Sequence, residues 1–255
     1  MTSSTHYVPS MKQGYLMTDH HIFDVDGTLT PSRAMMDPAF LSWFTTFNST
    51  HNVYLVTGSD SDKTIEQIGT KLFNSVQRSY NCSGNDVYEN GTNVISTGDL
   101  ELPLEVCVWC QKKLATSPFS YKTGGHFEAR SGLYNFSIVG RHATTVERAL
   151  YVIYDKYNNE RVQISDEFNS LFSSKYNIVS QVAGETGLDI IPIGKDKSQI
   201  LKDFNKSDNI MFYGDSIYPG GNDWSIAKAI EEGYASCTIN HVKNWKETWN
   251  SLLLL

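Results

Sequence analysis

Short apolar runs alternate with amphipathic segments in the first third of the chain. The apolar runs at 21–25 and 52–58 predict two buried strands, and 84–92 predicts a third short strand followed by a turn. Between them, 37–48 and 59–73 place apolar residues at the spacing of one helix face. This order is βαβαβ, which is typical of the start of a doubly wound parallel sheet.

Residues that favour helix starts support both helical assignments. Asp37 is a typical N-cap, and Pro38 follows it at the first helical position, where the missing amide proton costs nothing. The second helical segment opens with Ser59 and Asp60, which are also capping residues.

The pattern changes after residue 91. We expect in turn a hairpin, a helix, a strand pair joined near Ser131–Gly132, a helix and another strand pair, at 93–102, 103–115, 126–140, 144–158 and 176–194. Strand pairs with intervening helices indicate an antiparallel α+β module.

The first pattern then returns near the end of the chain. A helical segment at 198–204 precedes a strand at 209–215 and a closing helical region. We therefore expect an α/β protein with a doubly wound, Rossmann-like core made of 1–91 and 193–255, and an inserted α+β cap at 92–192.

Composition narrows the classes of partner. The net charge of −7 and a pI near 5.5 argue against nucleic acid as the main partner, since phosphate backbones select basic faces. Small phosphorylated ligands remain compatible, because they need only a local cluster of arginines.

The chain has no evident targeting signal. The first 21 residues are polar and mixed, without the apolar run of a signal peptide, and no stretch has the length of a membrane span. Of the four cysteines, Cys107 and Cys110 form a C-x-x-C that could be a redox pair or half a metal site, but their helical spacing favours buried core thiols. We expect a cytoplasmic protein with no membrane partner.

Carboxylates gather where strands are expected to end. Asp24 and Asp26 follow the first strand, 57–60 follows the second, and Asp215 follows the late strand, with Asp223 close behind. In open α/β sheets, ligands bind at the carboxyl ends of the strands. Taken alone, each of these aspartates could be a turn residue or a helix cap, but their combination favours a site.

Such a cluster needs a cation. Two unit charges ~4 Å apart repel by about 4 kcal/mol at an effective dielectric constant of 20. Oxygen ligands next to a phosphate suit Mg²⁺. Lys195 or Lys197 could supply further positive charge, and Thr57 a hydroxyl group.

These residues also resemble a known superfamily. "DVDGTLT", "LVTGSD", "GKDK" and "YGDSIYPGGNDW" are similar to the four motifs of the haloacid dehalogenase (HAD) phosphotransferases. The resemblance implies a HAD core with a cap, in which Asp24 is the nucleophile that becomes an aspartyl phosphate and Asp26 the general acid/base. It implies further catalytic roles for Thr57 and Lys197. The implied Mg²⁺ ligands are Asp24, Asp26 through its main-chain carbonyl, Asp215 and Asp223.

The insert resembles a narrower family. "FEARSGLYNFSIVGRHATTVERA" is similar to the cap of eukaryotic-type phosphomannomutases, and "YENGT" and "PGGND" are characteristic of that family too. Arg130, Arg141 and Arg148 match its substrate arginines in the cap, and Arg33 its core arginine. The full set of implied substrate-binding residues is Arg33, Gly58, Ser59, Arg130, Asn135, Arg141, Arg148, Gly187 and Asp189.

The family resemblance implies a function. The protein would interconvert mannose 6-phosphate and mannose 1-phosphate, with glucose phosphates as further candidates, through phospho-Asp24 and a hexose 1,6-bisphosphate activator, in GDP-mannose biosynthesis. Gly187 stands where the family has serine, and Thr57 where it usually has glycine. A Mg²⁺-dependent sugar phosphatase of the same fold is the alternative; a non-catalytic sensor is disfavoured because Asp24 and Asp26 are both present.

The family also pairs through its caps. The apolar helix expected around 103–114 could form a homodimer interface or could belong to an internal cap core, and the sequence leaves both options open.

Overall fold

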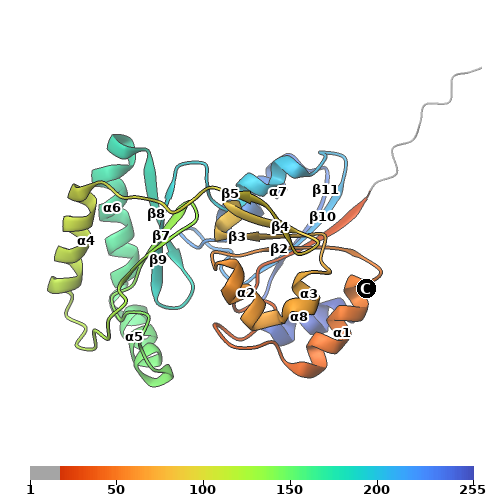
Figure 1. Cartoon of the computed structure of the whole chain (residues 1–255), viewed down its shortest axis with the longest axis horizontal. Helices are drawn as coiled ribbons and strands as arrows, with labels where there is room; N and C mark the ends of the chain where they lie inside the picture. Colours follow the sequence, from red (N-terminus) through yellow and green to blue (C-terminus); the bar gives the residue numbers. More distant parts are fainter. Residues whose placement is uncertain (1–17) are drawn as a thin grey trace, which may run out of the picture.

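The computed structural model describes residues 18–255, in two sheets with their covering helices (Figure 1). The segment 1–17, most of the stretch in which no signal peptide is expected, lies outside the described residues. Among the described residues, none of the helices combines the length and the apolar character that crossing a membrane requires.

The larger sheet has seven strands in the order β11-β10-β1-β2-β3-β4-β5. The first five of these pair in parallel, and β4 and β5 add an antiparallel edge. Their bounds are β1 Asp19–Phe23, β2 Asn52–Val56, β3 Arg78–Asn81, β4 Asp86–Glu89, β5 Thr92–Ser96, β10 Asn209–Gly214 and β11 Ser236–His241.

Helices cover both faces of this sheet. One face carries α1 Pro38–Asn48, α2 Ser61–Ile68, α3 Thr70–Phe73 and α8 Trp245–Leu252, and the other carries the 3₁₀ helix η2 Lys197–Asp203 and α7 Trp224–Gly233 (Figure 1). Neighbouring residues of β1 show why: Phe23 packs in the first apolar cluster and Ile22 in the second, and both are fully buried. A strand covered on both faces reads as a continuous apolar run, as the sequence predicted.

The smaller sheet has four antiparallel strands in the order β6-β7-β9-β8. Its strands and helices are β6 Phe127–Arg130, β7 Leu133–Phe136, β8 Ile178–Ala183, β9 Gly187–Pro192, α4 Leu104–Thr116, α5 Thr145–Asn158 and α6 Glu160–Tyr176. An apolar cluster joins this sheet to its helices, and α4 and α6 lie on the side away from the larger sheet (Figure 1). Cys110 is buried in the cluster and Cys107 is half-buried, so the expected pair of core thiols is confirmed for Cys110 alone.

Three elements differ from the sequence prediction. The third parallel strand is β3, which the sequence analysis missed because "RSYN" is polar; 84–92 instead contains the antiparallel strand β4. Helix α6 was not predicted, because its apolar residues lie on both faces: Phe168 is buried while Leu171 is 49 % exposed. The closing region contains the edge strand β11 as well as two helices.

The hairpin expected at 93–102 also differs. It is formed instead by β4 and β5, which turn at Asn90–Gly91 and both belong to the larger sheet. The division into core and cap remains a proposal, and we propose that the insert begins after Ser96 rather than at residue 92.

Candidate active site

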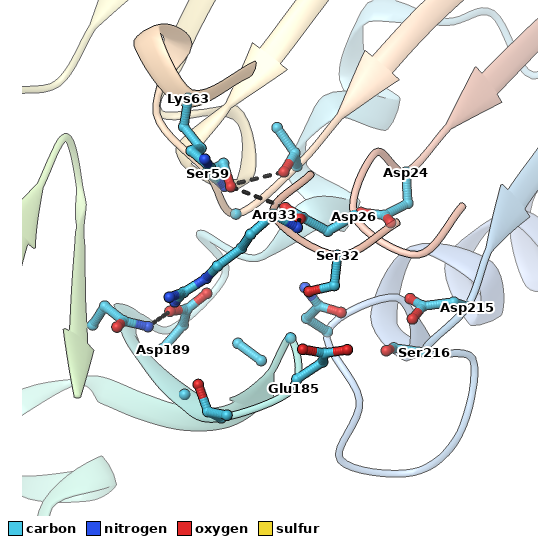
Figure 2. A pocket seen from close by; sticks show the side chains of 18 of the residues that line it. Asp24, Asp26, Ser32, Arg33, Ser59, Lys63, Glu185, Asp189, Asp215 and Ser216 are labelled. Atoms are coloured by element: carbon cyan, nitrogen blue, oxygen red, sulfur yellow. Dashed lines mark hydrogen bonds between the residues drawn. The ribbon is translucent and has the colours of Figure 1, made fainter. Parts of the chain in front are cut away.

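A pocket lies between the carboxyl ends of the parallel strands and the open face of the smaller sheet (Figure 2). Of the residues expected at a site, it is lined by Asp24, Asp26, Arg33, Thr57, Gly58, Ser59, Arg130, Asn135, Arg141, Gly187, Asp189 and Asp215. Three more, Arg148, Lys197 and Asp223, lie behind this lining and contact it through Thr186, Asp24 and Ser216 respectively. The structure therefore gathers the whole expected set, and Lys195 is not part of it.

Asp24 lies directly after β1, and its amide donates to the carbonyl of Tyr213 on β10 at 2.9 Å. Its Oδ1 accepts a hydrogen bond from Nζ of Lys197 at 2.6 Å. Nζ of Lys197, whose side chain is fully buried, also donates to Oδ1 of Asp223 at 2.6 Å. Oδ2 of Asp24 is buried and has no hydrogen-bond partner among residues 18–255. One oxygen of Asp24 is thus held in place while the other remains unpaired.

Asp24, Asp215 and Asp223 form an acidic cluster, in which one oxygen of each lies within 4.8 Å of the others. Burial raises the pKa of Asp24 well above its usual range, and burial together with the charge of Asp223 raises the pKa of Asp215 to about 7. Burial would lower the pKa of Lys197, but the charges of Asp223 and Asp24 outweigh it and raise that pKa.

The acidic cluster fits a divalent cation. Three carboxylates, with one oxygen of each within 4.8 Å of the others, face a single ammonium group, which leaves two negative charges when all are ionised. Hard oxygen donors of this kind suit Mg²⁺.

Asp26 is held by three donors. Its Oδ1 accepts from the amide of Arg33 at 2.7 Å and from Nε2 of Gln67 at 2.9 Å, while Oδ2 accepts from the hydroxyl of Ser59 at 3.1 Å. The sequence analysis missed Gln67, although a glutamine on the buried face of the helix that follows "TGSD" was an available signal. These bonds fix the orientation of the Asp26 carboxylate.

The tight turn between the two aspartates and Thr30 depends on Gly27. This residue has a φ of +84°, and a Cβ atom built there would lie 2.5 Å from Oδ2 of Asp215. A glycine is therefore needed both for the backbone conformation and for the approach of Asp215 to the turn.

Four arginines surround the pocket: three of them line it, and Arg148 lies behind Thr186 and Glu185. Arg130 and Arg141 share the carboxylate of Glu128, with Nη2 of Arg130 at 2.5 Å and Nη1 of Arg141 at 3.0 Å from Oε2. Arg148 pairs with Glu185, with Nη2 and Oε2 3.1 Å apart.

The fourth, Arg33, reaches from the core into the pocket (Figure 2), and its guanidinium makes no ion pair with a described carboxylate. Burial, followed by the charges of Arg148 and Arg141, lowers the pKa of Arg33 to about 10. This concentration of positive charge suits a dianion.

A buried amide–carboxyl pair lies beside these arginines. Nδ2 of Asn135 donates to Oδ1 of Asp189 at 2.7 Å, and Oδ1 of Asn135 is buried without a partner among the described residues. Burial raises the pKa of Asp189. The free carbonyl oxygen of Asn135 can accept a bond from a ligand hydroxyl.

The loop after β2 completes the core side. The hydroxyl of Thr57 accepts a hydrogen bond from the amide of Ser59 at 3.0 Å. Lys63 also lines the pocket, and the sequence analysis did not single it out.

Comparison with known proteins identifies the family. Residues 40–249 match the family described as eukaryotic phosphomannomutase. The chain belongs to this family. It is 31 % identical over 215 residues to the phosphomannomutase of Schizosaccharomyces pombe, covering 80 % of this chain and 83 % of that protein. It is 30 % identical over 211 residues to the phosphomannomutase of Arabidopsis thaliana, covering 80 % and 85 %.

Solved structures show the same fold. The IMP-bound, N-terminally truncated IMP-nucleotidase of Plasmodium falciparum superposes with a TM-score of 0.59 at 16 % identity, over 94 % of this chain and 69 % of that chain. The C-terminal domain of C. albicans trehalose-6-phosphate phosphatase gives a TM-score of 0.60 at 14 % identity, over 93 % and 91 %. The expected family and the HAD fold are therefore both confirmed.

Proposed function

We propose that the protein is a phosphomannomutase, an isomerase that interconverts mannose 6-phosphate and mannose 1-phosphate, with glucose phosphates as further substrates. Family membership supports the reaction class. The observation within the site that carries this proposal is one partly unpaired carboxylate, Asp24, in a pocket that three arginines line and that a fourth, Arg148, adjoins. A hexose bisphosphate has a dianion at each end, and this pocket offers a place for both.

Each residue of the site has its own role in the proposed reaction. Oδ2 of Asp24 attacks phosphorus, the bond from phosphorus to the sugar oxygen breaks, and Asp26 protonates that oxygen. In the second half-reaction the incoming hydroxyl gives its proton to Asp26 and attacks phosphorus, and the bond from phosphorus to Oδ2 of Asp24 breaks. Lys197 holds Asp24 in position, and the arginines hold the other phosphate. Asn135 and Asp189 bind sugar hydroxyls. Mg²⁺, held by Asp24, Asp215, the main-chain carbonyl of Asp26 and, as a further candidate, Asp223, would offset the carboxylate charge.

An assay of products tests this proposal. The purified protein is given mannose 1-phosphate, Mg²⁺ and a hexose 1,6-bisphosphate activator, and both mannose 6-phosphate and inorganic phosphate are measured. We expect mannose 6-phosphate, no activity in Asp24→Asn, and unchanged activity in the control Asp62→Asn, whose side chain is exposed on α2. Release of inorganic phosphate without isomerisation would instead establish the sugar phosphatase.

The cellular setting follows from the same proposal. A mannose phosphate mutase would serve GDP-mannose biosynthesis in the cytoplasm. A homodimer through the cap is supported by α4, on which Leu104 and Val108 are 78 % and 56 % exposed. A sizing experiment tests the dimer, and Val108→Glu should convert it to a monomer.

A further inference from the structure

Glu185 differs from the other carboxylate that pairs with the cap arginines. It lies in the loop between β8 and β9, and its carboxylate lines the pocket (Figure 2). Glu128, the partner of Arg130 and Arg141, is not among the residues that line it. The counterion of Arg148 therefore lies at the wall of the pocket, between Arg148 and any ligand bound there.

Arg148 does not line the pocket itself, but it contacts two residues that do, Thr186 and Glu185. Its side chain is 12 % exposed, its Nη1 donates to the hydroxyl of Thr186 at 3.1 Å, and its Nη2 contacts Glu185. Thr186 is neutral and buried, so it orients the guanidinium without adding charge. Glu185 supplies a negative charge on a side chain that is 48 % exposed, so it can turn out to solvent at little cost.

A ligand phosphate and the Glu185 carboxylate would repel each other strongly if both contacted the guanidinium of Arg148. We propose that Glu185 is an internal counterion that competes with the non-transferring phosphate of the substrate for Arg148 and so sets the affinity of the cap side of the pocket. This inference rests on the proposed function.

The exchange has a use in a mutase. A bisphosphate intermediate must turn end for end, so the contact between its phosphate and Arg148 has to break without leaving that half-buried arginine unpaired. When the phosphate leaves, Glu185 returns to Arg148 and stabilises the cap between the two half-reactions. Glu185 therefore lowers the affinity of the pocket for the bisphosphate and favours release of the bisphosphate from Arg148.

The test is the binding of inorganic phosphate and of mannose 6-phosphate, measured by calorimetry. Glu185→Gln should bind both about two- to fivefold more tightly than the natural protein, the range expected when one half-exposed ion pair no longer competes. The control is Glu167→Gln, which removes the same charge from an ion pair with Lys113 on the cap helices, outside the pocket. The affinity of Glu167→Gln for inorganic phosphate and for mannose 6-phosphate should equal that of the natural protein.

A second variant assigns the gain to Arg148. In an Arg148→Gln background, Glu185→Gln should change phosphate affinity by less than its effect alone, since the competed group is gone. Unchanged or weaker binding in Glu185→Gln, an equal gain in both backgrounds, or no phosphate binding at all would overturn the proposal. Turnover is measured separately: if neither protein isomerises mannose 1-phosphate, the proposed function fails while the phosphate comparison still judges Glu185.

Discussion

Nη1 of Arg130 donates a hydrogen bond to the main-chain oxygen of Gly58 at 2.9 Å. Arg130 ends strand β6 of the smaller sheet and Gly58 lies in the loop after strand β2 of the larger sheet, so this bond joins the two sides of the pocket. The same guanidinium contacts Glu128, and its side chain is 8 % exposed. One planar group therefore holds a cap carboxylate and a core carbonyl together.

Replacing Arg130 by lysine should separate the effect of its positive charge from the effect of its two hydrogen-bonded contacts. An ammonium group keeps the charge but lacks the planar fork that reaches both acceptors. Because a charge-assisted bond contributes about 1.5–3 kcal/mol, we expect kcat/KM for mannose 1-phosphate to fall by about 10- to 100-fold. Arg78→Lys, on core strand β3, is the control and should keep its activity. Equal kcat/KM values for Arg130→Lys and the natural protein would contradict the assigned role.

Lys197 offers a test through stability. Its ammonium is the common partner of two buried carboxylates, Asp24 and Asp223. Lys197→Met should lower the free energy of unfolding by about 3–5 kcal/mol, because removing one member of a buried ion pair leaves uncompensated charge. Adding Asp223→Asn to Lys197→Met should recover part of the loss. Urea unfolding of the single and double variants measures both effects, and a double variant less stable than Lys197→Met alone would show that the charges are not the cause.

The sequence predicted the parts of the molecule in which one local pattern dominates. The buried parallel strands β1, β2 and β10 were found because strands covered on both faces are continuous apolar runs. The polar strand β3 was missed, because its side chains bond inside the protein: Oδ1 of Asn81 accepts a hydrogen bond from the hydroxyl of Thr64 at 2.9 Å. No local signal distinguishes such a strand from a loop.

The candidate site, too, was predicted only in part from the sequence. Motifs at strand ends located the aspartates, and the structure brings those aspartates together with the cap arginines. The partners of these residues were not predicted. Gln67 left a signal on the buried face of its helix that was missed, whereas Glu128 and Glu185 act through three-dimensional contacts that no sequence spacing specifies. Glu185 in particular changes the interpretation of Arg148, which the family resemblance gave as a substrate arginine and which pairs with this carboxylate.

Gly187 stands where the family has a serine, and its surroundings in the structure leave little room for that side chain. A Cβ atom built at Gly187 would lie 2.8 Å from Nδ2 of Asn135, the atom that donates to Asp189. Restoring the serine of the family by Gly187→Ser should therefore displace Asn135 and raise KM by about tenfold, as expected for one disturbed buried hydrogen bond. The control is Gly194→Ser, outside the pocket lining, where no atom lies within 4 Å of the added Cβ, although its φ of +80° adds some strain. A lower KM in Gly187→Ser would contradict this account of the pocket.

Gln67 should act as a positioning residue for Asp26. Its Nε2 donates to Asp26 and to the hydroxyl of Thr30, at 2.9 and 3.0 Å. Gln67→Met keeps the volume and removes the donor, so we expect kcat to fall by about tenfold with little change in KM, because substrate contacts remain. Gln67→Glu should not restore kcat, since a second carboxylate would repel Asp26. Loss of activity through a raised KM, or full activity in Gln67→Met, would refute this role.

His21 should make stability depend on pH. It is buried on β1, and burial, followed by the charge of His51, lowers its pKa from 6.5 to about 4. A group with a lowered folded pKa binds its proton first in the unfolded chain, so His21 destabilises the fold progressively as pH falls from about 6.5 toward 4. Between pH 7.5 and 5 this amounts to about 2 kcal/mol. His21→Phe, which can keep the aromatic packing against Phe47, should lose that much less stability over the interval, measured by urea unfolding. The exposed His142 provides the control, and His142→Gln should retain the natural pH dependence. If His21→Phe lost stability as steeply as the natural protein, the acid sensitivity would have to come from other groups.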